Sequence, residues 1–96
     1  MGLAPEEDVA AAELSLLVMN AGSAFARPLP QGGEILLGRG DDCDVVIDDP
    51  KVSRHHLVVR VTRGDVLVVD KGSRNGSFLG AMQLVPEQPV PVAVGD

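Results

Sequence analysis

The stretch from residue 38 to residue 77 decides the fold, and it reads GRGDDCDVVIDDPKVSRHHLVVRVTRGDVLVVDKGSRNGS. Short β-branched runs alternate there with clusters of Gly, Ser, Asp and Arg. We expect strands over Val45–Ile47, Leu57–Thr62 and Val66–Asp70, because such runs favour extended backbone. Between the last two, residues 63–65 (Arg-Gly-Asp) predict a tight hairpin, with Gly64 supplying the positive φ that such turns often require. The stretch therefore indicates pairs of short antiparallel strands.

Further strand signals lie on both sides of this stretch. Leu14–Met19 reads as a mostly buried strand, and the turn signal at residues 20–23 (Asn-Ala-Gly-Ser) follows it. The other expected strands are a short edge strand near Phe25, then Glu34–Leu37, Phe78–Leu79 and Gln83–Val85. Pro86, Pro89 and Pro91 limit the last segment to irregular chain or an edge strand. Strands at intervals of about ten residues predict an all-β antiparallel sandwich or barrel. Residues 1–12 are expected to form a flexible leader, and residues 13–96 one domain.

The composition restricts the class of protein. The 96 residues carry a formal net charge of −6, which argues against nucleic acid or an anionic membrane as the main partner, since both reward a basic surface. The single cysteine, Cys43, excludes an internal disulfide and suits a reducing compartment. No apolar run approaches the ~20 residues of a membrane span, and the acidic residues 6–8 stand where a secretory signal would carry Lys or Arg. We therefore expect a cytoplasmic protein.

The positive charges are concentrated in the polar segments between the apolar runs. Five of the eight Lys and Arg residues lie in these segments: Arg39, Lys51, Arg54, Lys71 and Arg74. If the fold gathers the segments, an acidic chain gains one local cationic site. Such a site favours a compact anion, for example a single phosphate, over a long polyanion.

The groups offered by these segments suit a phosphorylated peptide. Arg39 follows the end of an expected strand, and its guanidinium can form a fork to two phosphate oxygens. Ser53 offers a hydroxyl and a backbone N–H, while Arg54 and Arg74 offer two further cations. The Asn75 amide both donates and accepts hydrogen bonds, which suits pairing with a peptide backbone.

The order and spacing of these motifs resemble the forkhead-associated (FHA) domains. The resemblance runs from about Leu14 to the C-terminus and rests on Gly38-Arg39, Ser53-x-x-His56 and Asn75-Gly76. Supporting features are Asp44, Val52 and Asp70. It implies a β-sandwich of two antiparallel sheets, with the ligand held by loops at one end.

The resemblance also implies roles for individual residues. Arg39 and Ser53 would bind a phosphate directly, and Arg54 would contact the phosphate or the flanking peptide. Asn75 would hold the peptide main chain beside a phosphothreonine. Arg74 is a further candidate ligand, although many members of the family have a small hydroxyl residue at this position.

Three residues of the motifs would be structural by resemblance: Gly38, His56 and Gly76. The His56 ring would brace the loop that presents Ser53, and Gly76 permits a close approach or a positive φ. The implied function is a phosphothreonine-peptide recognition module in bacterial signalling or transcriptional regulation. Its partner would be a phosphothreonine-containing protein, either a separate protein or another part of the same full-length protein.

The chain stops after Gly95-Asp96, where members of the family normally continue into two further strands that pair with the first strand. We therefore expect a sandwich that lacks its last two strands. The Leu14–Met19 strand would then have no neighbour, which favours completion by strand exchange in a dimer.

Three alternatives compete with this interpretation. A hydrolase using Ser53 and His56 would need a nucleophile elbow and an orienting acid, and the sequence marks neither. A metal site at His55 and His56 is disfavoured, because adjacent residues of a strand point to opposite faces and the nearby acids fit no EF-hand spacing. We expect no catalytic activity, no cofactor and no metal. The third alternative, a sandwich that docks its partner without phosphate, stays open, and only the phosphate hypothesis requires the charge of Arg39.

Overall fold

The structure, a computed structural model, describes residues 15–20, 23–62 and 65–93. These contain nine strands: β1 (Ser15–Asn20), β2 (Ser23–Pro28), β3 (Gly32–Gly38), β4 (Val45–Val46), β5 (Leu57–Thr62), β6 (Asp65–Asp70), β7 (Phe78–Leu79), β8 (Met82–Gln83) and β9 (Val90–Val92). Among these residues, no helix is long and apolar enough to cross a lipid bilayer. The predicted leader, residues 21–22 of the first turn and the conformation of Gly64 lie outside the described residues.

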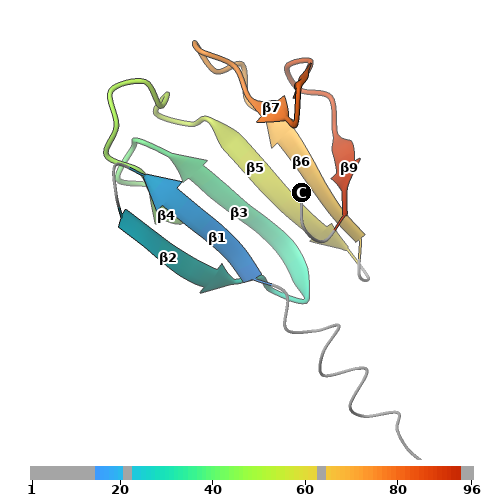
Figure 1. The fold of residues 1–96 in the computed structure, drawn as a ribbon. Helices are drawn as coiled ribbons and strands as arrows, with labels where there is room; N and C mark the ends of the chain where they lie inside the picture. Colours follow the sequence, from blue (N-terminus) through green and yellow to red (C-terminus); the bar gives the residue numbers. More distant parts are fainter. Residues whose placement is uncertain (1–14, 21–22, 63–64, 94–96) are drawn as a thin grey trace, which may run out of the picture.

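The strands form one large sheet and two hairpins (Figure 1). The five-stranded sheet has the order β4-β3-β5-β6-β9, and the hairpins are β1–β2 and β7–β8. All pairs are antiparallel except β3–β4, which is parallel. The all-β sandwich is thus confirmed, but the prediction of purely antiparallel pairing is wrong at this edge. The chain reverses twice between Gly38 and Val45, and it therefore returns alongside β3 in the same direction.

The core lies between hairpin β1–β2 and the five-stranded sheet. Alternate residues of the central strands face it, including Ile35 and Leu37 of β3 and Val59 and Val61 of β5. Val18 of β1 packs against them from the other layer. Burying each such aliphatic side chain contributes about 1.5–3 kcal/mol, so this contact stabilises the packing of the hairpin on the sheet.

β1 differs from its prediction in two respects. It is not mostly buried, because Val18 is 8% exposed while Leu17 and Met19 are 60% and 74% exposed. Only one face of the strand packs on the core, and an apolar sequence on both faces concealed this. β1 also has a neighbour, since β2 pairs with it from Ser15 opposite Pro28 to Asn20 opposite Ser23. The expectation of an unpaired first strand is therefore wrong.

The remaining expectations for the strands are met closely. β5 covers the predicted residues, and the pairing of Thr62 with Asp65 confirms the tight β5–β6 hairpin. The strand expected at Gln83–Val85 is found as β8 at Met82–Gln83, because these two residues pair with β7. Val85 lies outside this strand and is exposed to solvent. β9 is the edge strand expected among the prolines. It tolerates Pro91, since a proline lacks the N–H that a central strand needs.

Candidate functional site

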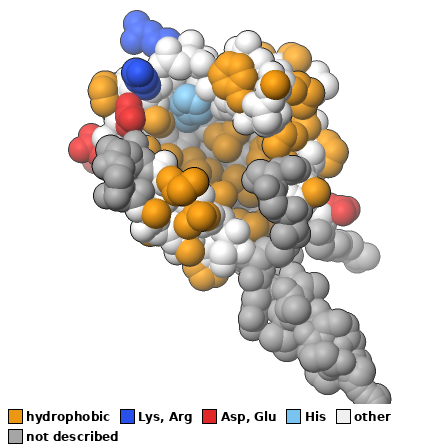
Figure 2. All heavy atoms as spheres, viewed as in Figure 1, with side chains coloured by type: hydrophobic (Ala, Val, Ile, Leu, Met, Phe, Trp, Pro, Cys, Tyr) orange, Lys and Arg blue, Asp and Glu red, His pale blue; other side chains and the backbone are white. Residues whose placement is uncertain are grey.

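Three loops meet at one end of the five-stranded sheet. The first loop follows β3 (residues 39–44), the second precedes β5 (residues 47–56) and the third follows β6 (residues 71–77). Together these three loops are called the joined loops below. The first two are joined through their backbones, with the Arg39 N–H donating to the Ser53 carbonyl at 2.9 Å and the Gly40 N–H donating to the Arg54 carbonyl at 3.0 Å. Figure 2 shows the Lys and Arg side chains of this face gathered at the same end.

Gly38 allows these two loops to approach each other. A Cβ atom at this position would stand 2.8 Å from the Arg54 carbonyl carbon and 3.0 Å from Cys43 Sγ. The first of these distances is shorter than any normal contact of a Cβ atom. Only glycine therefore lets Arg39 leave β3 directly beside Ser53.

The Ser53 side chain is held in one orientation and keeps its proton available. Its Oγ accepts a hydrogen bond from the Arg74 N–H at 2.9 Å, which joins the second loop to the third. A serine hydroxyl has one donor and two acceptor positions. Because the backbone N–H occupies an acceptor position, the O–H remains free to donate to an anion. The Arg39 side chain is exposed, and the Arg39 backbone N–H is bonded to the Ser53 carbonyl, so the guanidinium and the hydroxyl belong to neighbouring segments of backbone.

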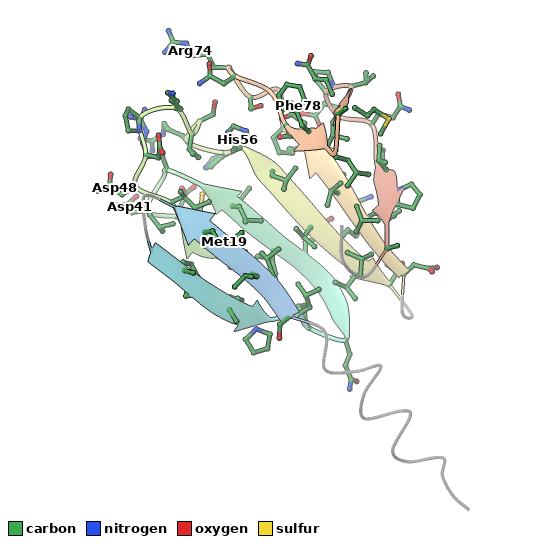
Figure 3. The ribbon with its side chains drawn as sticks, viewed as in Figure 1. Met19, Asp41, Asp48, His56, Arg74 and Phe78 are labelled. Carbon is green, nitrogen blue, oxygen red and sulfur yellow. The ribbon has the colours of Figure 1, made fainter. Side chains whose placement is uncertain are left out.

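His56 uses both of its ring nitrogens to join the second and third loops. Nδ1 accepts from the Ser53 N–H at 3.0 Å, and Nε2 lies 2.9 Å from the Gly76 carbonyl oxygen. Since Nδ1 is the acceptor, the neutral ring carries its proton on Nε2 and donates it to Gly76. Gly76 itself has a φ of 84°, as its position in the motif led us to expect. Figure 3 shows the ring below the loop that carries Arg74.

This arrangement bears on the hydrolase alternative. A catalytic base must have a free nitrogen that faces the nucleophile's hydroxyl. Both nitrogens of His56 are committed to backbone groups, and the Ser53 hydroxyl bonds to Arg74 rather than to His56. The pair is therefore arranged to position a loop, and not to activate a serine.

Asn75 lies exposed beside Ser53 and retains groups for a ligand. One hydrogen of its Nδ2 is donated to the Lys51 carbonyl at 2.7 Å, which fixes the side chain. Its second N–H and its Oδ1 stay available in the part of the chain that the structure describes. An amide with one donor and one acceptor free can pair with both polar groups of a peptide unit.

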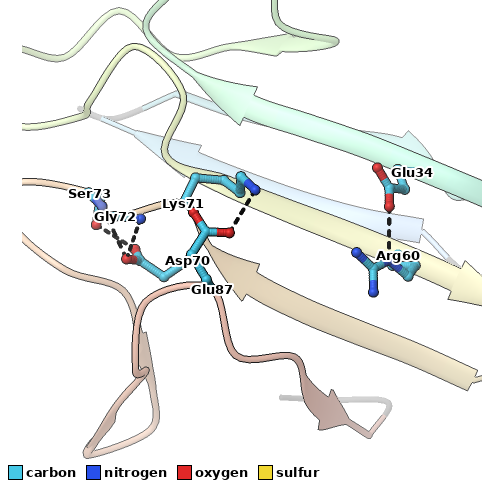
Figure 4. A network of polar contacts seen from close by, with 7 residues as sticks. All are labelled: Glu34, Arg60, Asp70, Lys71, Gly72, Ser73 and Glu87. Atoms are coloured by element: carbon cyan, nitrogen blue, oxygen red, sulfur yellow. Dashed lines mark hydrogen bonds and ion pairs between the residues drawn. The ribbon is translucent and has the colours of Figure 1, made fainter.

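Asp70 supports the third loop from below and is 1% exposed. Its carboxylate accepts hydrogen bonds from the backbone N–H groups of Gly72 (3.0 Å) and Ser73 (3.1 Å), and from the Ser73 hydroxyl (Figure 4). The Ser77 hydroxyl also donates to this carboxylate, at 2.6 Å. Burial by itself would raise the pKa of Asp70, but these hydrogen bonds outweigh burial and hold the pKa below its ordinary value. The third loop is thus built around a buried carboxylate.

The structure places the predicted site residues on adjoining loops, but the Lys71 side chain is engaged elsewhere. Arg39, Arg54, Arg74 and Asn75 are exposed and Ser53 is half-buried, all on the joined loops. Lys71, which the sequence grouped with the site cations, instead forms an ion pair with Glu87 at 2.8 Å. The sequence did not predict that the Lys51 carbonyl anchors Asn75 or that Ser77 bonds to Asp70. Neither residue belongs to a recognisable motif, so these contacts are seen only in the folded loops.

A further group of polar residues lies behind the first loop. His55 Nε2 and Asp42 Oδ2 are 2.8 Å apart, and together with Cys43 Sγ these ligand-type atoms lie within 4.8 Å of one another. The histidines precede β5, so the strand argument against a metal does not apply to them. A metal would need the Cys43 thiolate, but burial and the Asp42 charge raise the pKa of this thiol, which donates to the Arg54 carbonyl. The group is therefore poorly suited to binding a cation.

The chain is similar to known proteins over most of its length. The FHA domain family matches residues 35–96. The oxoglutarate dehydrogenase inhibitor of Corynebacterium glutamicum is 36% identical over 73 residues, which cover 76% of this chain and 51% of the inhibitor. The glycogen accumulation regulator GarA of Mycolicibacterium smegmatis is 42% identical over 60 residues, covering 62% of this chain and 36% of GarA. The chain thus spans about half the length of these curated relatives or less.

A solved structure agrees with the sequence similarity. It comes from a structural and functional analysis of phosphothreonine-dependent FHA domain interactions, and it superimposes with a TM-score of 0.63 at 30% sequence identity. The superposition covers 84% of this chain and 78% of the solved chain. The shared part therefore includes most of the strands and loops described above.

Proposed function

Because this chain belongs to the FHA domain family, we propose that its joined loops recognise phosphothreonine in a peptide segment of a partner protein. One observation carries the proposal. The Arg39 N–H bonds to the Ser53 carbonyl, so that an exposed guanidinium and a free hydroxyl stand on adjoining backbone. These are the donors that a phosphate dianion requires, and each hydrogen bond to a charged group contributes about 1.5–3 kcal/mol.

The other site residues divide the remaining work. Arg54, on the same loop as Ser53, adds a cation toward the phosphate or the adjacent peptide. Asn75, fixed through Lys51, holds the peptide main chain. Gly38, His56 and Gly76 maintain the loops in their positions. The proposed module binds its partner and performs no chemistry on it. This is supported by His56, because both of its ring nitrogens are hydrogen-bonded to backbone groups.

The biological setting is proposed by analogy. The two curated relatives are bacterial regulators by name, one an inhibitor of oxoglutarate dehydrogenase and the other a regulator of glycogen accumulation. A role in phosphorylation-dependent bacterial regulation is consistent with both. The partner would be a phosphothreonine protein, and a cytoplasmic location stays a prediction.

Self-association of this chain is a separate part of the proposal. Among the described residues β1 pairs only with β2, which leaves one edge of β1 open. Leu17 and Met19 on that strand are strongly exposed. An open apolar edge strand favours pairing with a strand of another copy. Sedimentation of the chain across a concentration series should reveal a dimer, and a monomer at all concentrations would oppose this part.

The phosphothreonine proposal is tested by an amide-shift titration. The chain is titrated with a degenerate phosphothreonine peptide library, with phosphoserine and unphosphorylated libraries in parallel. Saturable shifts at Ser53 and Asn75 are expected with phosphothreonine, and weaker binding of phosphoserine by roughly fourfold if burial of the methyl group is the only difference.

Matched variants make this experiment decisive. Arg39→Gln should weaken binding roughly 30-fold or more, because the fork to the phosphate is lost. Arg60→Gln removes the same charge from β5, where Arg60 pairs with Glu34 at 2.9 Å, and should leave affinity unchanged. Equal affinity of the phosphorylated and unphosphorylated libraries would instead favour docking without phosphate.

A further inference from the structure

The cations of this chain fall into two groups by their partners. Arg63 lies outside the described residues, which leaves seven of the eight Lys and Arg residues. Three of these have partners: Arg60 with Glu34, Lys71 with Glu87, and Arg27 with the Asp44 carbonyl at 2.9 Å. The other four form neither a side-chain hydrogen bond nor an ion pair with any described residue: Arg39, Lys51, Arg54 and Arg74. All four stand on the joined loops.

Four free cations exceed what one phosphate can use. A phosphothreonine carries a charge of about −1.5 to −2 and three acceptor oxygens. The Arg39 fork, the Ser53 hydroxyl and the Arg54 cation already supply donors for these oxygens. The side chains of Lys51 and Arg74 therefore remain without a hydrogen bond or ion pair to any described residue, in a chain whose formal net charge is −6.

Arg74 is anchored at its backbone and free at its guanidinium. Its N–H is held by Ser53 Oγ at 2.9 Å, and the next residue, Asn75, is fixed to the Lys51 carbonyl. In Figure 3 the Arg74 side chain extends from the outer end of its loop, away from the strands and away from His56. The guanidinium therefore points outward at the end of the sheet where the loops meet, and not back into the joint between the loops (Figure 3).

We propose that Arg74 is a specificity-determining residue that binds a second negatively charged side chain of the phosphothreonine peptide. The inference rests on the proposed function and adds the class of peptide to it: one that carries a carboxylate or a second phosphate near the phosphothreonine. A guanidinium forms paired hydrogen bonds with either group, whereas the ammonium of Lys51 acts as a single point charge. For this reason we expect Arg74, rather than Lys51, to bind such a group.

The test compares peptides that differ in one charge. A reference phosphothreonine peptide is flanked only by Ala and Ser, and a series carries a single Asp moved through each flanking position. A final peptide has phosphoserine at the best position, which separates a phosphate from a carboxylate as the second anion. Affinities are measured for the native chain and for Arg74→Gln, Lys51→Gln and Arg60→Gln, with thermal unfolding as a check of folding.

The expected result is specific to one position and one variant. Asp at one flanking position should raise the affinity of the native chain roughly threefold to tenfold over the reference peptide. Arg74→Gln should lose this gain but still bind the reference peptide, while Arg60→Gln and Lys51→Gln keep the gain. A larger gain with phosphoserine would mark a second phosphate as the preferred anion.

Other outcomes overturn the proposal, and they are distinguishable. If no Asp position raises affinity, or if Arg74→Gln keeps the gain, Arg74 does not read a second anion. Loss of the gain in Lys51→Gln alone would assign that anion to Lys51 instead. If the reference peptide itself fails to bind the native chain, the phosphothreonine function fails, and this inference fails with it.

Discussion

The backbone N–H of Arg74 donates a hydrogen bond to the side-chain oxygen of Ser53, at 2.9 Å and across 21 positions of sequence. This bond sets the direction of the Ser53 hydroxyl before any ligand arrives. Preorganised donors reduce the cost of ordering a site on binding. The same bond makes the position of Arg74 dependent on Ser53, so the two residues are one unit of the site.

Ser53→Ala should lower phosphothreonine-peptide affinity roughly tenfold to a hundredfold, since it removes one hydrogen bond to a charged group. Ser53→Thr keeps the hydroxyl and should recover most of the affinity. Isothermal titration calorimetry with one phosphothreonine peptide measures both. Equal affinity of Ser53→Ala and the native chain would remove Ser53 from the phosphate site.

Gly38→Ala should destabilise the fold by about 1–3 kcal/mol, as expected for overpacking. The new methyl group would press on the Arg54 carbonyl and on Cys43 Sγ, so the joined loops must separate. Chemical denaturation measures the loss, and peptide affinity should fall with it. Gly32→Ala is the matched control, because a Cβ there meets only the Val61 carbonyl at 3.9 Å. A similar loss of unfolding free energy in both variants would show that alanine destabilises β3 at any position, and would contradict a specific clash at Gly38.

His56→Ala should cost about 1–3 kcal/mol of unfolding free energy, because it leaves the Ser53 N–H and the Gly76 carbonyl without their partner. Peptide affinity should also fall, since the loop that presents Ser53 loses its support. His55→Ala is the matched control, as His55 is exposed and contacts Asp42 at the surface. We expect it to unfold close to the native chain. An unaffected His56→Ala variant would contradict the bracing role.

Asp70 should make stability depend on pH in the acidic range. Its folded-state pKa is held below the ordinary value of about 3.9. Its contribution is therefore complete above that value, and it is lost as pH falls through the lower folded-state pKa. Asp70→Asn should be less stable by on the order of 3 kcal/mol at neutral pH, and its stability should fall less between neutral and acidic pH than that of the native chain.

Denaturation at a series of pH values measures this dependence. Asp48→Asn is the control, because Asp48 is exposed and has no hydrogen bond or ion pair to the described residues. It should retain the pH dependence of the native chain. If Asp70→Asn retains that dependence as well, another carboxylate is responsible for it.

The sequence predicts the parts of this fold that depend on local pattern. The β-branched run at Leu57–Thr62 and the short turn after it are found as β5 and its hairpin to β6. The order of the Gly-Arg, Ser-x-x-His and Asn-Gly motifs likewise predicts which loops meet. Each of these signals is contained in neighbouring residues, or in a motif order that the family shares.

The parts that the sequence does not predict depend on contacts between distant segments. The parallel β3–β4 pair follows from the path of the intervening loop, where the Ile47 N–H donates to the Gly38 carbonyl at 2.8 Å. The exposed face of β1 is as apolar as its buried face, so pattern alone cannot separate Met19 from Val18. The buried state of Asp70 is also invisible until the serines of the third loop surround it.

The hydrogen bonds between the second and third loops also determine the stage of folding at which the site can form. They join residues that are 20 to 24 positions apart: His56 with Gly76, Ser53 with Arg74, and Lys51 with Asn75. No partly folded chain that lacks the β5–β6 hairpin can hold these pairs together. Ligand affinity is therefore coupled to formation of the β5–β6 hairpin, and a peptide at a hundred times its dissociation constant should stabilise the domain by about 2.7 kcal/mol. A phosphorylated partner would in this way also act as a folding ligand that protects the domain from unfolding and proteolysis.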